Sequence, residues 1–152
     1  MITVKGDLVT LALDGQFNVI VHGCNCFCAM GAGIARQIRE TFPQAYAADL
    51  KTVSGDKNKL GNFSSALVQS NGQQLTVING YTQYQYAGTG ILADYGAIET
   101  LFNRIKKDFP KKRIGYPKIG AGLARGDWKK ISQIIDRALT GETHTLVEYA
   151  RE

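Results

Sequence analysis

Residues 18–36 read NVIVHGCNCFCAMGAGIAR, and residues 120–125, GAGLAR, repeat the last six of them with one change. Residues 18–24 form a short apolar run, which predicts a buried strand. The first hexapeptide, residues 31–36, opens an amphipathic stretch over residues 33–42 that has helical spacing. The second hexapeptide also follows a predicted strand and precedes a predicted helix. Strands and helices that alternate around glycine-rich loops indicate an α/β fold.

The remaining apolar segments continue this alternation. Further strands are expected at residues 2–5, with an extension over residues 8–13, and at residues 65–69, 75–81, 113–119 and 144–149. Further helices are expected at residues 45–53, 94–109 and 127–139. The pair Asn71-Gly72 predicts a hairpin turn, and residues 80–90 form a polar loop rich in tyrosine. The whole pattern predicts a three-layer α/β/α sandwich with a mixed, mostly parallel central sheet, whose ligands bind beyond the carboxyl ends of its strands.

Length and composition restrict the class of protein. A chain of 152 residues predicts one domain, residues 1–152, and 44% hydrophobic with 20% charged residues is typical of a globular protein rather than a disordered one. No apolar run approaches the ~18 residues of a membrane span, so no membrane partner is expected. Residues 1–7 lack the basic and apolar pattern of a secretory signal, which favours a cytoplasmic protein.

Charge and cysteine content bear on the partners. The net charge of +5 predicts a ligand that carries phosphate. The basic residues at positions 106–113 are not interleaved with aromatic residues that would stack on bases, so nucleic acid is not the expected partner. Cys24, Cys26 and Cys28 alternate without a second pair at the spacing of a zinc site. This pattern predicts reduced thiols, with neither a metal nor a cofactor.

The two hexapeptides have the chemistry of an anion site. Glycines between a strand and a helix allow backbone N–H groups to point into one concavity, and the following helix adds its positive end. Two such loops suit two neighbouring phosphates, as in a diphosphate. Arg36 and Arg125 stand where a dinucleotide fingerprint has its third glycine, and no Gly-Lys-Ser/Thr follows either loop, so a hydride-transferring enzyme and a P-loop are disfavoured. Tight turns without a ligand remain the alternative.

Four polar residues near these loops are candidates for chemistry. Asn25 is able to hydrogen-bond to a ribose diol or a water molecule, or else caps its own turn. His22 is a candidate general acid or base, or a structural histidine at the end of a strand. Asp7 offers a carboxylate to an exocyclic amine, or serves as a turn residue. Asp127 is expected to cap the helix at residues 127–139 and is also a candidate base.

Taken together, four segments resemble the macrodomains, a family of proteins that bind ADP-ribose and its derivatives. The segments span nearly the whole chain and are Gly6-Asp7-Leu8, residues 22–35, residues 117–128 and Val147-Glu148-Tyr149. Within the family, His-Gly-Cys-Asn-Cys at residues 22–26 and Met-Gly-Ala-Gly-Ile-Ala at residues 30–35 are most similar to the fungal ADP-ribose 1''-phosphate phosphatase type. They are also similar to the terminal ADP-ribose protein glycohydrolase type.

The resemblance implies a role for each matching position. Asp7 would bind the adenine amino group, with Leu8 beside it among the substrate-binding residues, and Tyr149 would line the adenine pocket. Asn25 would bind the distal ribose. The residues of the two hexapeptides that would surround the diphosphate and the phosphate on the distal ribose are Gly31, Ala32, Gly33, Ile34, Gly120, Ala121, Gly122, Leu123 and Ala124.

The resemblance further implies hydrolysis of ADP-ribose 1''-phosphate to ADP-ribose and phosphate, with Asn25, His22 and Asp127 as candidate catalytic residues. Glycohydrolase-type relatives have an aspartate where this chain has Ala124 and a lysine where it has Gln83, so a lysine adduct with the opened ribose is not expected. Two alternatives stay open. One is a hydrolase for O-acetyl-ADP-ribose or for an ADP-ribosylated protein, and the other is a non-catalytic module that binds ADP-ribose.

Overall fold

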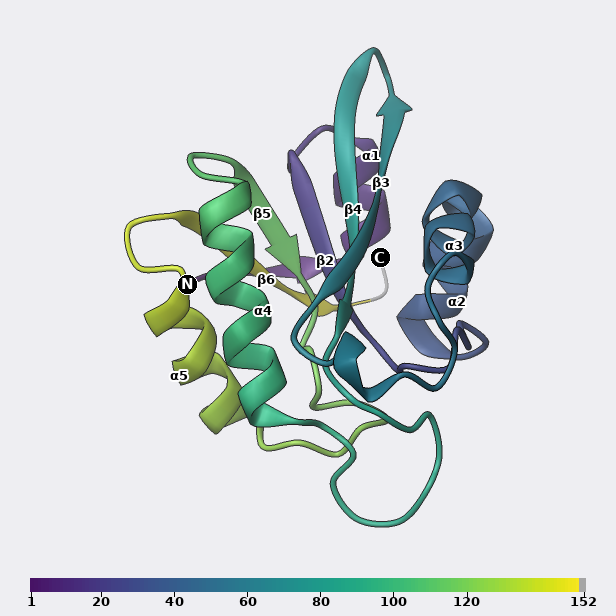
Figure 1. The fold of residues 1–152 in the computed structure, drawn as a ribbon. Helices are drawn as coiled ribbons and strands as arrows, with labels where there is room; N and C mark the ends of the chain where they lie inside the picture. The colour runs from purple at the N-terminus through teal and green to yellow at the C-terminus, as the bar shows by residue number, and fades with distance from the viewer. Residues whose placement is uncertain (151–152) are drawn as a thin grey trace.

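A six-stranded sheet forms the centre of the computed structural model, which describes residues 1–150 (Figure 1). The strands are β1 (Ile2–Gly6), β2 (Val19–Cys24), β3 (Phe63–Ser70), β4 (Gln73–Tyr81), β5 (Arg113–Tyr116) and β6 (Thr143–Tyr149). Their spatial order is β1-β6-β5-β2-β4-β3. β3 runs antiparallel to β4, and the other neighbouring strands are parallel. This arrangement confirms the predicted mixed, mostly parallel sheet.

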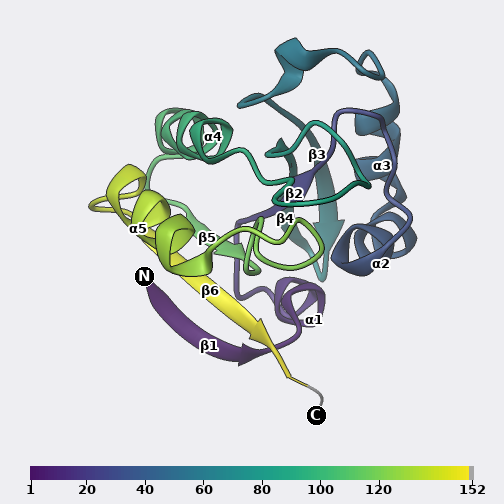
Figure 2. The same cartoon turned by 90° about the horizontal axis from the view of Figure 1, so that it is seen from below.

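Helices cover both faces of the sheet and complete the three predicted layers. One face carries α1 (Leu8–Leu13), α2 (Gly33–Thr41) and α3 (Pro43–Leu50). The other face carries α4 (Tyr95–Asp108) and α5 (Trp128–Ala138), as the view from below shows (Figure 2). A short 3-10 helix, Lys57–Lys59, precedes β3. None of the helices described over residues 1–150 is long and apolar enough to cross a membrane.

The two faces of β2 show how the core is divided. Val19 and Val21 belong to the core under α4 and α5, whereas Ile20 belongs to the core under α1 and α2. All three residues are at most 1% exposed, and side chains alternate between the faces of a strand. A strand that is buried on both faces is a nearly continuous apolar run, and in β2 His22 is the polar exception. The sequence pattern at residues 18–24 therefore predicted this strand well.

Residues 8–13 form the helix α1 and not the strand extension that the sequence suggested. Asp7 is the N-cap of this helix, because its Oδ1 accepts a hydrogen bond from the backbone N–H of Thr10 at 2.9 Å. Three residues that share one face of the helix are buried, namely Leu8, Val9 and Ala12. The β-branched residues of the stretch favoured a strand, but the cap and the buried helical face outweigh that preference.

Several other boundaries differ from the sequence prediction, two of them because of a proline, and one turn is confirmed. β5 ends at Tyr116 and not at residue 119, because Pro117 has no N–H to donate to a neighbouring strand. α3 begins at Pro43 and not at residue 45, since a proline is favoured where a helix starts. The Asn71-Gly72 turn joins β3 to β4, and both residues have positive φ, 50° and 75°, as a type I′ turn requires.

Candidate functional site

The candidate site lies at the edge of the sheet where the parallel strands end, which we call the carboxyl edge. In the strand register, Gly6 at the end of β1 is paired with Tyr149 of β6, and Cys24 at the end of β2 is paired with Tyr81 of β4. The loops that follow β2, β4 and β5 all leave from this edge, at the bottom of Figure 1, and Figure 2 views them end on. Ligands of α/β sheets bind at such an edge.

The two hexapeptides lie side by side at the carboxyl edge. Cδ1 of Leu123, in the second hexapeptide, is 3.7 Å from the position that a Cβ atom would take on Gly33, in the first. Gly33 has no Cβ atom of its own, so the distance shows that two residues 90 positions apart in the chain are close neighbours in space. The predicted adjacency of the two hexapeptides is therefore confirmed.

The two hexapeptides nevertheless differ in conformation. The first runs directly into α2, which begins at Gly33 with a φ of 58°. The second forms a series of turns, in which the N–H of Gly126 donates to the carbonyl of Gly120 at 2.6 Å, and α5 begins only at Trp128. Each copy therefore follows a strand and precedes a helix, as predicted, but two residues separate the second copy from α5.

The start of α2 is open to an anion. Its N-cap residue is Ala32, which has no side-chain acceptor for the N–H groups of the first turn. Gly31 just before it is exposed, and so is Gly122 in the second hexapeptide, with no atom within 4 Å of where a Cβ atom would lie on either glycine. Backbone N–H groups and the positive end of a helix dipole are favourable to phosphate.

Asn25 shapes the loop that carries the first hexapeptide. Its Oδ1 accepts hydrogen bonds from the N–H of Phe27 at 2.9 Å and of Ala29 at 3.4 Å, and its Nδ2 donates to the carbonyl of Ala29 at 2.8 Å. Both ends of the amide therefore serve the turn between residues 25 and 29. The interpretation of Asn25 as the cap of its own turn agrees with this geometry.

His22 lies inside the molecule. Its side chain has no exposed surface, and its Nε2 is 2.7 Å from Oδ1 of Asn79 on the neighbouring strand β4. Burial lowers the pKa of His22 to about 4, although the bond to Asn79 acts in the opposite direction. The ring is therefore neutral near pH 7, and its contacts are those of the structural histidine that the sequence left as an alternative.

Asp7 and Tyr149 lie at one end of the carboxyl edge, where β1 and β6 end. Besides capping α1, the carboxylate of Asp7 accepts hydrogen bonds from Nε2 of Gln37 at 3.0 and 3.1 Å. Partial burial by itself would raise the pKa of Asp7, but the hydrogen bonds from Thr10 and Gln37 outweigh it and lower the pKa. Tyr149 is 72% exposed, and Leu8, the first residue of α1, is buried in the core. Asp7 is thus ionised, and the tyrosine ring is free to contact a ligand.

Asp127 caps α5, as predicted, and remains exposed. Its Oδ1 accepts a hydrogen bond from the N–H of Lys129 at 3.0 Å, while its own N–H donates to the hydroxyl of Tyr95 at 3.1 Å. It follows the second hexapeptide by two residues. An exposed carboxylate beside the second hexapeptide is in a suitable place to accept a proton from a water molecule.

A buried polar cluster behind the loop that follows β2 was not predicted from the sequence. Lys59 is only 7% exposed, and its Nζ donates to the carbonyl of Cys26 at 3.1 Å and lies 4.6 Å from the ring centroid of Tyr81. The hydroxyl of Tyr81 donates to Oδ1 of Asp49 at 2.7 Å. Burial raises the pKa of Asp49, while Tyr81 and Lys59 act in the opposite direction. This cluster holds the loop in place from inside the molecule.

The three cysteines are free thiols, and Cys24 and Cys26 are buried. Burial raises the pKa of both buried thiols. Over residues 1–150 no group of three histidine, cysteine or acidic side chains lies close enough together to hold a metal ion.

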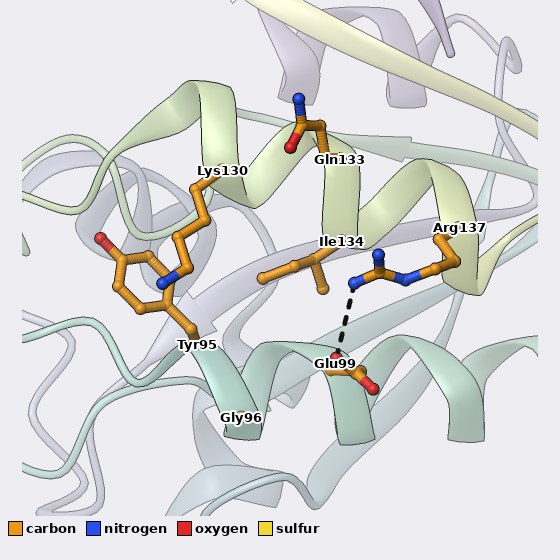
Figure 3. Close-up of a pocket in the computed structure, with 7 residues that line it drawn as sticks. All are labelled: Tyr95, Gly96, Glu99, Lys130, Gln133, Ile134 and Arg137. Atoms are coloured by element: carbon orange, nitrogen blue, oxygen red, sulfur yellow. Dashed lines mark ion pairs between the residues drawn. The ribbon is translucent and has the colours of Figure 1, made fainter.

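Two surface hollows lie outside the two hexapeptides, and the first of them reaches Tyr95, whose hydroxyl accepts a hydrogen bond from the N–H of Asp127. One, of about 290 Å³, lies between α4 and α5, where Lys130 is 4.2 Å from the ring centroid of Tyr95 and Arg137 pairs with Glu99 at 3.8 Å (Figure 3). The other, of about 510 Å³, lies between α3 and β3. Neither is lined by the hexapeptides. We therefore assign the candidate site by the strand ends and loops, which bring the matching residues together, and not by the size of these hollows.

The strand order and the helices on both faces define the class of protein as one with the macrodomain fold. The macrodomain of Mycobacterium tuberculosis DarG has a TM-score of 0.74 at 23% identity, and the match covers 100% of this chain and 99% of that one. Thermosipho africanus DarTG, solved in complex with ADP-ribose, has a TM-score of 0.73 at 16% identity over 97% of this chain and 42% of that one. These two likenesses show the fold.

The sequence gives a narrower relationship. The chain is 36% identical over 138 residues to an uncharacterised 17.5 kDa protein in the tk-vs intergenic region of Enterobacteria phage T4, and the match covers 88% of this chain and 86% of that protein. The chain therefore belongs to the family of this phage protein. No protein-family model matches the chain.

Proposed function

We propose that this protein binds ADP-ribose derivatives at the carboxyl edge and hydrolyses ADP-ribose 1''-phosphate. The observation that carries the proposal is that Leu123 lies next to Gly33, because this brings the two glycine-rich loops side by side. The macrodomain fold supports the proposal, since a protein with that fold, Thermosipho africanus DarTG, is known in complex with ADP-ribose.

The ligand would lie along the carboxyl edge. Asp7 and Tyr149 at the ends of β1 and β6 would bind adenine, with Leu8 beneath them. From β1 to β2 is three strand spacings, roughly 14 Å, which is enough to separate a base from a diphosphate. The diphosphate would then meet the uncapped start of α2 and the second hexapeptide. Asn25 would contribute by holding its loop in shape beneath the distal ribose.

The reaction would be an attack of water on the terminal phosphorus. The water oxygen forms the new bond to phosphorus while the bond from phosphorus to the ribose 1'' oxygen breaks, and the proton of the water ends on that ribose oxygen. Asp127 is the exposed group best placed to accept the proton first, since His22 has no surface. Backbone N–H groups of the hexapeptides would stabilise the charge on the phosphoryl oxygens.

A second candidate function is a non-catalytic module that binds ADP-ribose. Two of the three residues that the sequence nominated for catalysis are occupied with internal hydrogen bonds, Asn25 with its own loop and His22 with Asn79. A site in which the loops bind phosphate and no side chain activates water would have the same fold and the same ligand.

Phosphate release from ADP-ribose 1''-phosphate distinguishes the two. We expect turnover by the wild-type protein and a loss of about 100-fold in Asp127→Asn, because the amide cannot accept the proton. Asparagine still caps a helix, so ADP-ribose affinity and the free energy of unfolding should stay close to those of the wild type. The matched control is Asp94→Asn, which changes the capping aspartate of α4 in the same way and should keep its turnover.

Other outcomes point elsewhere. Tight binding of ADP-ribose without phosphate release would favour the non-catalytic module, and release of ADP-ribose from a modified protein would favour a hydrolase for protein-linked ADP-ribose. No heat in calorimetry on addition of ADP-ribose would overturn the proposal as a whole.

A further inference from the structure

Arg125, the last residue of the second hexapeptide, joins two loops of the carboxyl edge. Its Nε donates to the carbonyl of Gly90 and its Nη2 donates to the carbonyl of Gly88, both at 2.6 Å. Both acceptors belong to the loop at residues 84–92, which follows β4 and which we call the tyrosine loop. The two donors use the fork of the guanidinium group, a geometry that a single ammonium group cannot reproduce.

The tip of the tyrosine loop is held by this contact and by the ring of Tyr86, whose centroid lies 6.0 Å from that of Phe27. Residues 85–91 are all exposed. Among the hydrogen bonds that the structure gives for residues 1–150, the two from Arg125 are the only ones that tie residues 86–91 to the rest of the chain. The two ends of the loop are held separately, by the bridge between Gln83 and Ala93 and by the bond from the N–H of Leu92 to the carbonyl of Ala124 at 2.9 Å.

The backbone on both sides is shaped for the contact. Arg125 has a φ of 59°, and Gly90 has a φ of 74°. A residue with a side chain rarely adopts the left-handed region, and such residues occur at sites where a ligand or a loop is clamped. The base of the loop packs on the other hexapeptide's loop, since the ring of Tyr84 lies 4.8 Å from that of Phe27. The tyrosine loop thus spans both glycine-rich loops.

Arg36, the matching residue of the first hexapeptide, does not contact another loop. Nε of Arg36 pairs with Oε1 of Glu40 at 3.0 Å, one turn further along the same helix, and both side chains are exposed. The repeat therefore places an arginine at the same sequence position twice, and only the second one reaches another segment. This difference provides an internal control.

We propose that Arg125 is a positioning residue that fixes the tyrosine loop over the distal-ribose end of the ADP-ribose site. The inference rests on the proposed function. Arg125 would not touch the ligand; it would order the loop before the ligand arrives, so that less conformational entropy is lost on binding. β4 is four strand spacings from β1, roughly 19 Å, so the tyrosine loop should meet the distal ribose and not the adenosine half.

The test compares ADP-ribose with AMP in calorimetry, and adds hydrogen–deuterium exchange of the free protein. We expect Arg125→Ala to weaken ADP-ribose binding about tenfold and AMP binding less than about twofold. Deuterium uptake at residues 85–91 should rise without ligand. Arg125→Lys should be intermediate for both measurements, because it keeps the charge but not the fork. Arg36→Ala, which removes the same charge from the twin position, should leave both affinities and the exchange unchanged.

The outcomes separate this inference from the proposed function. If wild-type protein binds no ADP-ribose, the proposed function fails, and with it the role of the loop in recognition. If wild-type protein binds ADP-ribose and Arg125→Ala binds it equally well, the positioning role is overturned while the proposed function stands. An equal loss in Arg36→Ala, or an equal loss of ADP-ribose and AMP affinity in Arg125→Ala, also overturns it, because either result indicates a general effect of charge.

Discussion

The hydrogen bond between His22 and Asn79 ties together two central strands in a place without solvent. His22, which the sequence offered for acid–base chemistry, thus serves the fold. At the scale of single residues, burial decides whether a histidine takes part in acid–base chemistry or only in the packing of the core. A sequence pattern does not show whether a polar residue at the end of a strand is buried. The sequence allowed Asn25 either to bind a ligand or to cap its own turn. Only the loop geometry shows that it caps the turn.

The buried ring of His22 predicts a loss of stability in acid. Its pKa is about 4 in the folded protein against an ordinary value of 6.5. Between these values the unfolded state binds more protons, so the free energy of unfolding falls as the pH falls from 6.5 toward 4. We expect the protein to be about 2 kcal/mol less stable at pH 5 than at pH 8 from this group, measured by urea denaturation at constant salt.

His22→Gln is the control for this pH dependence. It should lower stability at every pH but flatten the slope between pH 4 and pH 6.5, because the titrating ring is gone. Burial also lowers the pKa of His144, so a smaller slope of the same sign should remain. If the free energy of unfolding of His22→Gln depends on pH as steeply as that of the wild type, His22 is not the group that causes the loss of stability in acid.

At the scale of elements, the sequence predicted those segments whose signals are local. The β3–β4 hairpin followed from Asn71-Gly72, and α4 followed from Asp94, whose Oδ1 accepts the N–H of Ala97. α1 was missed although Asp7 offered the same kind of cap, because its valine and threonine also suit a strand. Short segments with conflicting preferences are decided by packing, which a single sequence does not contain.

The two roles of Asp7 can be separated by substitution. Asp7→Ala removes the cap of α1 and should lower the free energy of unfolding by about 1 kcal/mol, measured by urea denaturation. Asp7→Asn keeps an oxygen for the N–H of Thr10 and should be nearly as stable as the wild type. If Asp7 binds the adenine amino group, both variants should weaken ADP-ribose binding alike; wild-type affinity in Asp7→Asn would remove Asp7 from the proposed site.

At the scale of the whole molecule, the order of strands brings together loops that the chain keeps far apart. The repeat of the hexapeptides could be read from the sequence and indicated that they act together. The pairing of Arg125 with Gly88 and Gly90, and that of Lys59 with Cys26, could not be predicted. Such contacts join segments that no sequence repeat or spacing relates to one another. They also depend on loop conformations, which are determined only once the sheet has assembled.

A ligand that spans the carboxyl edge should stabilise the whole molecule. At a free concentration of ADP-ribose 100 times its Kd, binding contributes about 2.7 kcal/mol to the free energy of unfolding. For a chain of this length, that corresponds to a rise in Tm of roughly 5–11 °C, measured by calorimetry or circular dichroism. AMP and ribose 5-phosphate, tested separately at the same concentration, should each give a smaller rise. A rise with either fragment as large as that with ADP-ribose would indicate a site confined to one part of the edge.

The alanine at the start of α2 has a consequence for anyone who would engineer this protein. A serine or aspartate in that place would strengthen the helix by about 1 kcal/mol, so a search for thermostable versions would favour it. The side-chain oxygen of that serine or aspartate would accept hydrogen bonds from the backbone N–H groups that would otherwise bind a phosphate. If the proposed function holds, helix stability and phosphate binding would compete for the same backbone N–H groups, which Ala32 leaves without a side-chain acceptor.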